Sequence, residues 1–552
     1  MKRFGCLILI GTMVLGLISG CGKKEEVKVE EKSKAHTEVA SEVLRKNLVK
    51  GAETLKPSKE LHFDNTLKIT GIGAFFGEYP REYEDCYLWP AIKKLTNAEV
   101  KVDWNEVEDY EGVIASTILM GKDNMPDIIV PETFGIMDMA KDELIVPLDD
   151  YLDEMPNIVK AVGEENMDKW RQADGHIYSF PKITNVQGAQ TMMVRKDWLD
   201  KLNMKEPTTW NDWIRLWEGI RDNDMNGDGD TTDEIPLMME QGDNGEMSMV
   251  PLLNAFGIKC SRDSLFCVLD DGTYTLTANH PRYKDFLKQV RMLYEEGLLD
   301  PDFENRNGDE MAKAMNENKV GTVFTWAERC RTSTEELNKK GEKDALWIST
   351  KPVKGPFGDQ MLQERNMITN VWCITAQAYN EGKAKDIVKL FNWMYGEEGS
   401  NLYCYGIEGV SYDRVDGRPV LKDEMVNTGF TNYRKAGCQF EPFGGYFQEE
   451  AFMQCLFMGK NVEELERDSV EFYKGLAEVN QGLYYSPVST LETESYVKHR
   501  SRLLTKKFCT LRNNVIKGKI STKEFWTEYR KLQEMGLDKM AEDGNKVYHK
   551  MD

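Results

Sequence analysis

The sequence predicts an α/β protein divided into two lobes. Beyond about residue 60, short strand-like segments alternate with segments of helical length, which is typical of a mainly parallel sheet covered by helices. The chain has 552 residues, whereas a single hydrophobic core stops growing at about 250–300 residues. We therefore expect two cores rather than one.

Residues 1–20 are expected to be an export signal. A basic start precedes an apolar run, residues 4–17, that is too short to span a bilayer comfortably. The following sequence, Ile-Ser-Gly-Cys21, resembles a bacterial lipobox, whose cysteine is acylated and becomes the new N-terminus. We expect Cys21 to carry fatty-acyl chains such as palmitate, and to anchor the protein at the extracellular face of the cell membrane. An ordinary secretory peptide with a chance cysteine is the alternative.

Residues 21–60 are expected to form a flexible tether between the membrane anchor and the body. From residue 22 this segment has no aromatic residue and many charges of both signs, so most of it cannot bury a core. The pattern allows one short helix near residues 38–48. A flexible tether of about 39 residues would reach roughly 35 Å.

Net charge and cysteine content narrow the class of protein. The formal net charge is −22 at pH 7, which argues against nucleic acid, because phosphate backbones require a basic surface. Of the 11 cysteines, Cys6 lies in the leader and Cys21 at the anchor, and the others show no CxxC spacing. We expect most of them to be small buried hydrophobic residues, with a few disulfides as the alternative.

The first part of the body alternates between strands and helices. Its expected elements are a strand at 67–72, a helix near 85–95, a strand at 100–104, a helix at 109–120 and a short buried strand at 127–130. Ligands bind at the carboxyl ends of the strands in such sheets. Phe75, Phe76 and Glu78 after the first strand, and residues 132–135 with Phe134 after the last, are therefore expected near the site as candidates for ligand contact.

A further amphipathic helix is predicted just before an acidic loop. Trp210, Trp213 and Trp217 recur at the spacing of one helical face, after Thr209 as the N-cap and with Asp212 in the first turn. Three tryptophans on one face suggest stacking on carbohydrate, but the same spacing is typical of a helix that packs on a core. We expect the core position.

The acidic loop at 224–235 has the spacing of a calcium-binding loop. Asp224, Asn226 and Asp228 supply side-chain oxygens at positions one, three and five, and Gly229 stands at position six, where such a loop turns sharply. Calcium collects about six to eight oxygens at roughly 2.3–2.6 Å, and this spacing delivers several of them from one short loop.

The end of this loop departs from an ordinary EF-hand. Position twelve is Ile235, so we expect the carbonyl of Asp230 and the carboxylate of Glu234 or Asp233 to complete the shell. Because the loop follows a core helix, the expected role of Ca²⁺ is structural. An acidic, hydrated turn without metal is the alternative.

Several segments, in order along the chain, resemble the extracellular solute-binding proteins of carbohydrate ABC transporters, in the large-chain branch found in Gram-positive bacteria. These segments are MPDII at 125–129, LDDYLDE at 148–154, DGHIYSFP at 174–181, VRKDWLDKL at 194–202 with Pro207–Thr209, DEIP at 233–236, NKVG at 318–321 with Trp326, YGIEGV at 405–410 and the tail at 518–540. Members of this branch are often described as binding aldouronates or other complex oligosaccharides, and alginate-binding relatives carry a similar calcium loop away from the sugar.

The resemblance implies a two-lobed periplasmic-binding-protein-like fold (type II) that closes on its ligand by a hinge. Residues 61–185 and 368–428 would form the first lobe, and residues 186–367 and 429–552 the second. The resemblance also implies a monomer that binds an oligosaccharide between its lobes and delivers it to the permease subunits of an ABC transporter. The acidic loop carries one more residue before Asp233-Glu234 than the family form.

Aromatic side chains are the expected ligand contacts, because their rings stack on the apolar faces of sugars. Trp326 follows a predicted strand and resembles, in its position, the tryptophan that stacks on sugar in related binding proteins; Tyr446 follows a flexible aromatic Gly-Gly turn. For both, the protein core is the alternative. Further candidates are Phe76, Glu78, Phe134, Tyr178, Arg195 and Trp372. If the ligand is an acidic sugar, Lys182, Arg195 and Arg365 are the candidates to pair with its uronate carboxylate.

A surface glycoside hydrolase or lyase is the main alternative, and a lipid-anchored adhesin or sensor is a third class. The 93 acidic residues make carboxylate pairs unavoidable, so such pairs carry no weight. No GxSxG, HExxH or GxxxxGK[ST] motif is present, and the 6 histidines do not have metal-ligand spacing. No repeat typical of an adhesin is visible. We therefore expect a binding protein without enzymatic activity.

Overall fold

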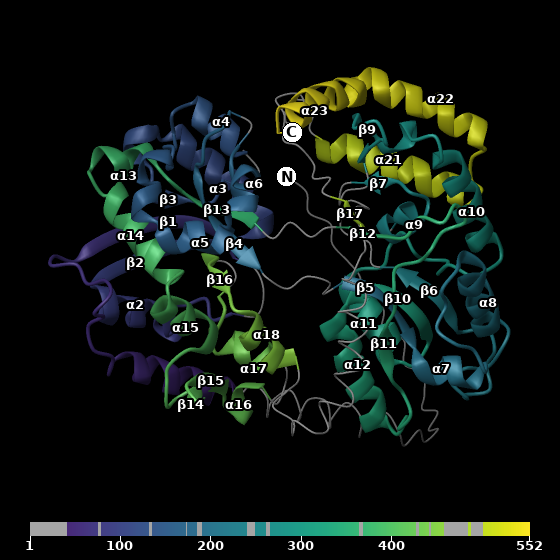
Figure 1. Cartoon of the computed structure of the whole chain (residues 1–552), viewed down its shortest axis with the longest axis horizontal. Helices are drawn as coiled ribbons and strands as arrows, with labels where there is room; N and C mark the ends of the chain where they lie inside the picture. Colours follow the sequence, from purple (N-terminus) through teal and green to yellow (C-terminus); the bar gives the residue numbers. More distant parts are fainter. Residues whose placement is uncertain are drawn as a thin grey trace, which may run out of the picture.

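The computed structural model contains two lobes, each with its own hydrophobic core and its own central sheet (Figure 1). Helices flank both sheets, so the prediction of an α/β fold with two lobes is confirmed. The structure describes residues 41–75, 79–131, 135–172, 174–184, 190–239, 249–260, 265–363, 368–426, 430–440, 443–456, 484–486 and 501–551.

The first lobe is built on a six-stranded mixed sheet. In spatial order its strands are β16 (Tyr446–Phe447), β4 (Ser179–Thr184), β13 (Ile368–Ile374), β3 (Ile128–Ile129), β1 (Leu67–Phe75) and β2 (Ala98–Glu106). Only β13 runs antiparallel to its neighbours. The helices of this lobe are α2 (Leu88–Thr96), α3 (Val107–Leu119), α4 (Ile136–Lys141), α5 (Pro156–Val162), α6 (Met167–Trp170), α13 (Ala376–Asn380), α14 (Ala384–Met394), α15 (Glu397–Tyr405), α16 (Asp423–Val426), α17 (Phe430–Lys435) and α18 (Glu449–Leu456), beside a hairpin of β14 (Tyr412–Val415) and β15 (Arg418–Leu421).

The second lobe contains a four-stranded sheet and a smaller three-stranded sheet. The larger sheet has the order β11 (Trp347–Ser349), β5 (Gln190–Arg195), β10 (Val320–Trp326) and β6 (Ile235–Met239), and the smaller one has β7 (Lys259–Cys260), β8 (Phe266–Val268) and β9 (Tyr274–Leu276). A separate pair is formed by β12 (Met361–Gln363) and β17 (Tyr484–Ser486).

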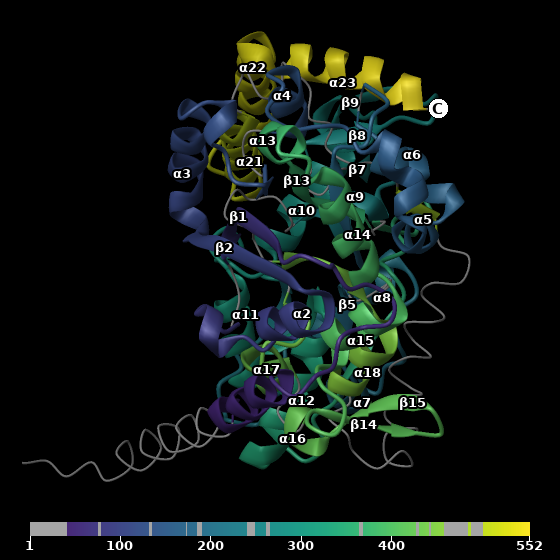
Figure 2. The same cartoon turned by 90° about the vertical axis from the view of Figure 1, so that its left-hand side faces the viewer.

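Helices surround the two sheets of the second lobe. They are α7 (Lys196–Lys201), α8 (Trp210–Arg221), α9 (Val250–Ala255), α10 (Tyr283–Glu295), α11 (Gly308–Asn316), α12 (Ala327–Lys340), α21 (Ser501–Ile516), α22 (Thr522–Leu532) and α23 (Asp538–Met551). The last three form a layer along one end of this lobe (Figures 1 and 2). Short 3-10 helices lie at Tyr83–Asp85, Lys122–Asn124, Asp149–Glu154, Glu164–Asn166 and Thr277–Asn279, and a π turn lies at Gln533–Leu537.

Helix α8 has the predicted start and the predicted buried face. The Thr209 side chain accepts from the backbone N–H of Asp212, and the Asp212 side chain caps Thr209 in return. Trp210, Trp213 and Trp217 are 5%, 0% and 0% exposed, so the core interpretation of the three tryptophans is confirmed. The indole N–H of Trp217 donates to Thr322 Oγ1 of β10 at 2.9 Å, which fixes the helix on the sheet.

The chain passes between the lobes from β4 to β5, from β12 to β13 and from α18 to α21. The expectation that residues 429–552 belong to the second lobe is corrected for residues 430–456. There, β16 extends the first sheet beside β4, and Phe443 and Ala451 lie in the first core. This pairing joins segments that are far apart in the sequence, so no local pattern reveals it.

The predicted tether is shorter than residues 21–60. Residues 41–52 are helical, and Leu44, Leu48 and Ala52 are buried in the core of the first lobe. The Ser41 hydroxyl donates to Asn432 Oδ1 at 2.8 Å. The pattern had allowed a short helix here, and its apolar face gives it a place in the core. Any tether therefore attaches to the first lobe.

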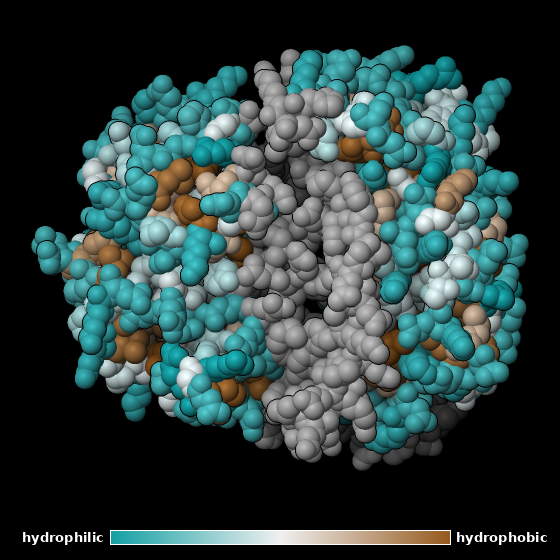
Figure 3. Space-filling view, viewed as in Figure 1, coloured by the Kyte–Doolittle hydropathy of each residue, from teal (hydrophilic) through white to brown (hydrophobic). Residues whose placement is uncertain are grey.

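The surface and the cysteines agree with the composition. Figure 3 shows a mainly hydrophilic surface with small, separate apolar patches on both lobes. Within the described ranges, no helix is both long and apolar enough to cross a bilayer. The 9 cysteines in these ranges are all buried free thiols, which confirms the expectation that most cysteines are small core residues.

Candidate functional site

Trp326 lies beside one of the chain segments that connect the two lobes. It is the last residue of β10, and its register partner is Gln190, the first residue of β5. The chain arrives at Gln190 from the first lobe, since β4 ends at Thr184. The Trp326 side chain is partly exposed. Sequence reasoning placed this tryptophan at a strand-to-loop transition; in the structure it ends the strand as predicted, but helix α12 begins directly after it at Ala327.

Tyr446 lies beside the same connecting segment, on the first lobe. It begins β16 and pairs with Ile183, which precedes the last residue of β4. Its side chain is partly exposed, and its ring centroid lies 6.4 Å from that of Tyr395. The thiol of Cys404 contacts its carbonyl oxygen at 3.3 Å. Trp326 and Tyr446 thus lie on different lobes, each next to an end of the segment that connects β4 to β5.

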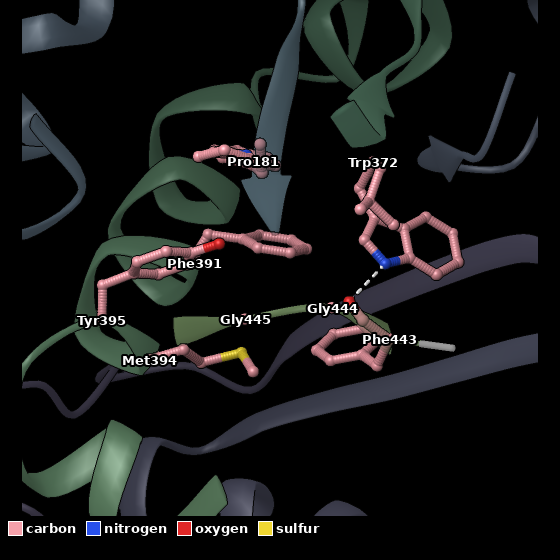
Figure 4. A pocket seen from close by; sticks show the side chains of 10 residues that line it. Pro181, Trp372, Phe391, Met394, Tyr395, Phe443, Gly444 and Gly445 are labelled. Atoms are coloured by element: carbon pink, nitrogen blue, oxygen red, sulfur yellow. Dashed lines mark hydrogen bonds between the residues drawn. The ribbon is translucent and has the colours of Figure 1, made fainter. Parts of the chain in front are cut away.

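Trp372 does not have the predicted ligand-facing position. It is 0% exposed, and its indole N–H donates to the carbonyl of Phe443 at 2.7 Å (Figure 4). Its ring lies 6.0 Å from Trp104 and 5.7 Å from Phe443. The reason is that β13 is an inner strand of the first sheet, so its side chains are covered by the packed layers on the faces of the sheet.

The aromatic Gly-Gly turn is also part of this packing. Phe443 is 1% exposed, and the positive φ angles of Gly444 (73°) and Gly445 (139°) let the chain enter β16 directly after it. The pocket between this turn, β4, β13 and α14 leaves no room for a water molecule, and Figure 4 shows how its side chains fill it. Phe180 and Phe391 stack there at 4.0 Å. We assign this pocket to the core of the lobe, not to ligand.

Arg195 is likewise a structural residue. It is 1% exposed, and its guanidinium donates to both carboxylate oxygens of Asp197, at 2.9 and 2.7 Å, and to Asn318 Oδ1 at 2.5 Å. The guanidinium also lies 4.8 Å from the ring of Trp198. All these partners belong to the second lobe, so the predicted contact with a uronate carboxylate is corrected. A buried arginine needs such partners, because an unpaired buried charge is costly.

The remaining candidates fall into two groups. Tyr178 is 8% exposed and donates its hydroxyl to Asp174 Oδ2 at 2.8 Å; burial, with help from Asp174, raises the pKa of Tyr178 to about 12. Lys182 lies on β4 and is partly exposed. The candidates that lie outside the described residues are Phe76, Glu78, Phe134 and Arg365.

The strand pattern placed Phe75 near the expected site, but sequence reasoning missed that it pairs with Trp104 at the carboxyl ends of β1 and β2. Phe75 and Trp104 are both partly exposed, and their ring centroids are 6.2 Å apart. Arg81 covers Phe75 at 5.4 Å, donates to the carbonyl of Trp104 at 3.0 Å and pairs with Glu106. Gly73 makes the arrangement possible, because a Cβ there would lie 3.0 Å from Trp104. Only the register of β1 on β2 reveals this, and sequence patterns do not give register.

The acidic loop is folded tightly by its own side chains. The Asp224 carboxylate accepts from the backbone N–H groups of Gly227 and Gly229 at 2.6 and 2.9 Å. Asn226 Oδ1 accepts from the N–H of Asp228 at 2.9 Å. The two glycines have φ angles of 81° and 94°, a region that residues with a Cβ seldom adopt. The side chains predicted to bind calcium therefore line one compact turn.

Two acidic residues lie at the end of the loop. Glu234 is 8% exposed; its Oε1 accepts from the N–H of Met225 at 2.8 Å, while its Oε2 is buried without a donor. Burial raises the pKa of Glu234. Asp233 pairs through Oδ2 with Lys319 at 3.0 Å, and its Oδ1 is likewise buried without a donor. A buried carboxylate oxygen without a donor is what a cation ligand requires.

The donor set fits a hard cation. It consists of carboxylate, amide and carbonyl oxygens, without nitrogen or sulfur, which is the set that calcium prefers. In the part of the chain that the structure describes, no three His, Cys, Asp or Glu side chains form a cluster able to hold a metal by themselves. The amide of Asn226 and the carbonyl of Asp230 would therefore have to contribute.

Comparison with known proteins identifies a family and several relatives. The family profile of bacterial extracellular solute-binding proteins matches residues 87–401. The fructooligosaccharide ABC transporter substrate-binding protein FusA of Streptococcus pneumoniae serotype 4 (strain ATCC BAA-334 / TIGR4) is 32% identical over 274 residues, which cover 47% of this chain and 49% of FusA. The match thus spans about half of that relative. Lipoprotein LipO of Bacillus subtilis (strain 168) is 22% identical over 474 residues, covering 83% of this chain and 88% of LipO.

Solved structures share the fold. Alginate-binding protein AlgQ2 without calcium ion superposes with a TM-score of 0.68 at 19% identity, covering 89% of this chain and 100% of AlgQ2. S. pneumoniae FusA in complex with kestose gives a TM-score of 0.64 at 21% identity, covering 88% of this chain and 99% of FusA. At these identities the similarity extends to the two-lobed α/β architecture.

Proposed function

Because the chain belongs to the family of bacterial extracellular solute-binding proteins, we propose that it captures an oligosaccharide between its lobes and delivers it to an ABC importer. The observation that carries this proposal is the placement of two partly exposed aromatic residues, Trp326 and Tyr446, on opposite lobes beside one passage of the chain. FusA, described as a fructooligosaccharide ABC transporter substrate-binding protein, supports the ligand class.

The two-lobed architecture suits capture by closure. Rotation of one lobe against the other about the chain segments that connect them would bring the two aromatic rings onto the ligand, as in hinge closure of binding proteins. Aromatic rings contact the apolar faces of pyranose or furanose units, while polar groups bind their hydroxyls. Such a site holds its ligand without changing it, and we propose no catalytic residue.

A thermal-shift screen tests the proposal. The panel contains kestose, alginate oligosaccharides and other acidic oligosaccharides; the first two follow the ligands named for FusA and AlgQ2. A ligand at 100 times its Kd should stabilise the protein by about 2.7 kcal/mol. Recovery of each sugar intact by chromatography separates binding from hydrolysis. Turnover of a sugar at an enzymatic rate would instead favour the hydrolase or lyase.

Replacement of Trp326 by alanine should weaken binding of the sugar found in this screen. Loss of one ring stack costs about 1–3 kcal/mol, or roughly 5- to 150-fold in Kd, as measured for stacking on other ring systems. Isothermal titration calorimetry measures the change. Because Trp326 is partly exposed, the melting temperature should change little.

The matched control is Trp526→Ala. Trp526 is also partly buried, but it lies on α22, in the layer at one end of the second lobe. Its replacement should leave the Kd unchanged. Unchanged affinity in a well-folded Trp326→Ala protein would remove Trp326 from the site, and so would severe destabilisation by that substitution.

We further propose that Cys21 is the acylated N-terminus of the mature protein. LipO, a lipoprotein that matches 83% of this chain, supports this. Metabolic labelling with an alkyne fatty acid should mark the wild type and leave Cys21→Ser unlabelled. Cys6→Ser, which changes only the leader, serves as the control and should be labelled normally. Equal labelling of wild type and Cys21→Ser would exclude a lipid at Cys21.

The acidic loop is proposed to hold a structural Ca²⁺. Asp224, Asn226 and Asp228 would bind through side chains, Asp230 through its carbonyl and Glu234 through its buried carboxylate. Glu234 and Asp233 each have a buried carboxylate oxygen without a donor, and Glu234 is favoured because Lys319 already pairs with the other oxygen of Asp233. The ion would neutralise the clustered carboxylates and so hold the end of α8 next to the start of β6.

A further inference from the structure

Two buried cysteines face each other across the small sheet of the second lobe. Cys260 of β7 and Cys267 of β8 are direct register partners in an antiparallel pair, and both are 0% exposed. Side chains of directly opposed residues project from the same face of a sheet. The two sulfur atoms therefore lie on one side of the sheet, towards the core.

The hydrogen-bond pattern shows which type of pair this is. Along β8 and β9, the N–H of Leu269 donates to Thr273 at 2.9 Å, and the N–H of Thr277 donates to Leu265 at 2.8 Å. Since the pattern alternates, Cys267 also directs its backbone groups to β9, and therefore not to β7. Cys260 and Cys267 thus form a non-hydrogen-bonded pair.

Such a pair has the spacing of a disulfide. Directly opposed residues of a non-hydrogen-bonded pair have Cα atoms about 4.5 Å apart, and disulfides join Cα atoms that are about 4.4–6.8 Å apart. The polar contacts of the thiols include Cys260 with Asn254 Oδ1 at 4.0 Å and Cys267 with the carbonyl of Leu276 at 3.8 Å, both long for hydrogen bonds to sulfur.

We propose that Cys260 and Cys267 form a cross-strand disulfide when the chain folds in the presence of a low-molecular-weight disulfide. One cysteine thiolate attacks the disulfide RSSR and releases one thiol, giving a mixed disulfide. The second cysteine then attacks the protein sulfur of that bond and releases the second thiol. The balance is two cysteine thiols plus RSSR giving one protein disulfide plus two RSH.

Burial decides when this oxidation occurs. The folded protein covers both sulfur atoms, and burial raises the pKa of Cys267 to about 12. Since the thiolate is the nucleophile, the folded, reduced protein reacts slowly. Exchange is expected before β7 and β8 pair, or after they separate.

The disulfide would stabilise the small sheet against which the C-terminal helix α23 packs. β9 lies against α23: the N–H of Tyr274 donates to Asn545 Oδ1 at 2.8 Å, and the rings of Tyr274 and Tyr548 stack at 5.8 Å. A link between β7 and β8 joins neighbouring strands of this same sheet. The oxidised protein should therefore unfold at a higher temperature than the reduced protein.

The test refolds the reduced full chain with a mixture of reduced and oxidised glutathione. Trypsin cleaves after Arg262, which lies between the two cysteines in the sequence. After non-reducing digestion, the two peptides should remain joined, with a mass about 2 Da below the sum of the free peptides. The protein should lose two reactive thiols in denaturant, and its melting temperature should fall when it is reduced.

Controls use other cysteines with the same burial. Cys260→Ala and Cys267→Ala should each abolish the joined peptide and the effect of reduction on melting. Cys330→Ala and Cys373→Ala, also at 0% exposed positions, should keep both. Cys509 is the competing partner, because its thiol also neighbours Tyr283 together with Cys260 and Cys267. Free thiols at 260 and 267 after refolding of the wild type, or a link from either to Cys509, would overturn the proposal.

Discussion

Trp372→Ala should lower the free energy of unfolding by about 3–5 kcal/mol, the usual cost of removing a buried aromatic side chain. Trp372 is fully buried against Trp104 and Phe443. The substitution also removes the donor to the carbonyl of Phe443, and an unsatisfied buried carbonyl adds to the cost. Urea unfolding followed by fluorescence or circular dichroism measures the change.

Comparison with Trp326→Ala separates a structural tryptophan from one expected to contact the ligand. Trp326 and Trp372 were both candidates for stacking on sugar, but only Trp326 is partly exposed. We expect Trp372→Ala to reduce stability and Trp326→Ala to reduce affinity. A Trp372→Ala protein that keeps its stability would contradict the core assignment of the aromatic turn as well, since Phe443 is the partner of Trp372.

Features that depend on local patterns were predicted well. The spacing of Trp210, Trp213 and Trp217, with Thr209 as N-cap, predicted both the start and the buried face of α8, because helical periodicity and capping are local. The alternation of strands and helices predicted the α/β class. Scattered cysteines without CxxC spacing were correctly expected in the core.

Features that depend on distant partners were not predicted. Arg195 seemed available to a ligand, yet Asn318, far along the chain, completes its buried shell. Trp372 is covered because β13 returns between β3 and β4 as an inner strand. Residues 430–456 join the first lobe because β16 pairs with β4. Strand order and register arise from tertiary packing, and periodicity does not encode them.

The helix at residues 41–52 shows why amino-acid composition did not predict where the tether ends. A highly charged segment without aromatic residues predicted a tether, since such segments do not build a core. Leu44, Leu48 and Ala52 nevertheless suffice to attach this helix to a core supplied by the rest of the lobe. A membrane anchor at Cys21 would therefore pull on the first lobe only, leaving the second lobe free to close.

Chelation of calcium should destabilise the protein, and Asp228→Ala should remove most of that sensitivity. A cation that binds the folded state at 100 times its Kd contributes about 2.7 kcal/mol. Asp224 and Asp228 accept from backbone N–H groups within the loop, and Glu234 accepts from the N–H of Met225 at its end. Without the ion this contribution is lost, so the melting temperature in EGTA should fall below that in calcium buffer. Differential scanning calorimetry in both buffers measures the difference.

Matched variants identify the ligand that completes the shell. Glu234→Gln should weaken calcium binding in a calorimetric titration, because Glu234 presents a buried, unpaired oxygen to the loop. Asp233→Asn should weaken it less, since Lys319 pairs with one oxygen of Asp233 and only Oδ1 is without a donor. Asp222→Ala, which removes an acid just outside the loop that pairs with Arg221, controls for net charge. If wild type and Asp228→Ala respond alike to EGTA, the loop is a hydrated acidic turn. In that event its fold rests on hydrogen bonds within the loop, such as those from Gly227 and Gly229 to Asp224 and from Asp228 to Asn226.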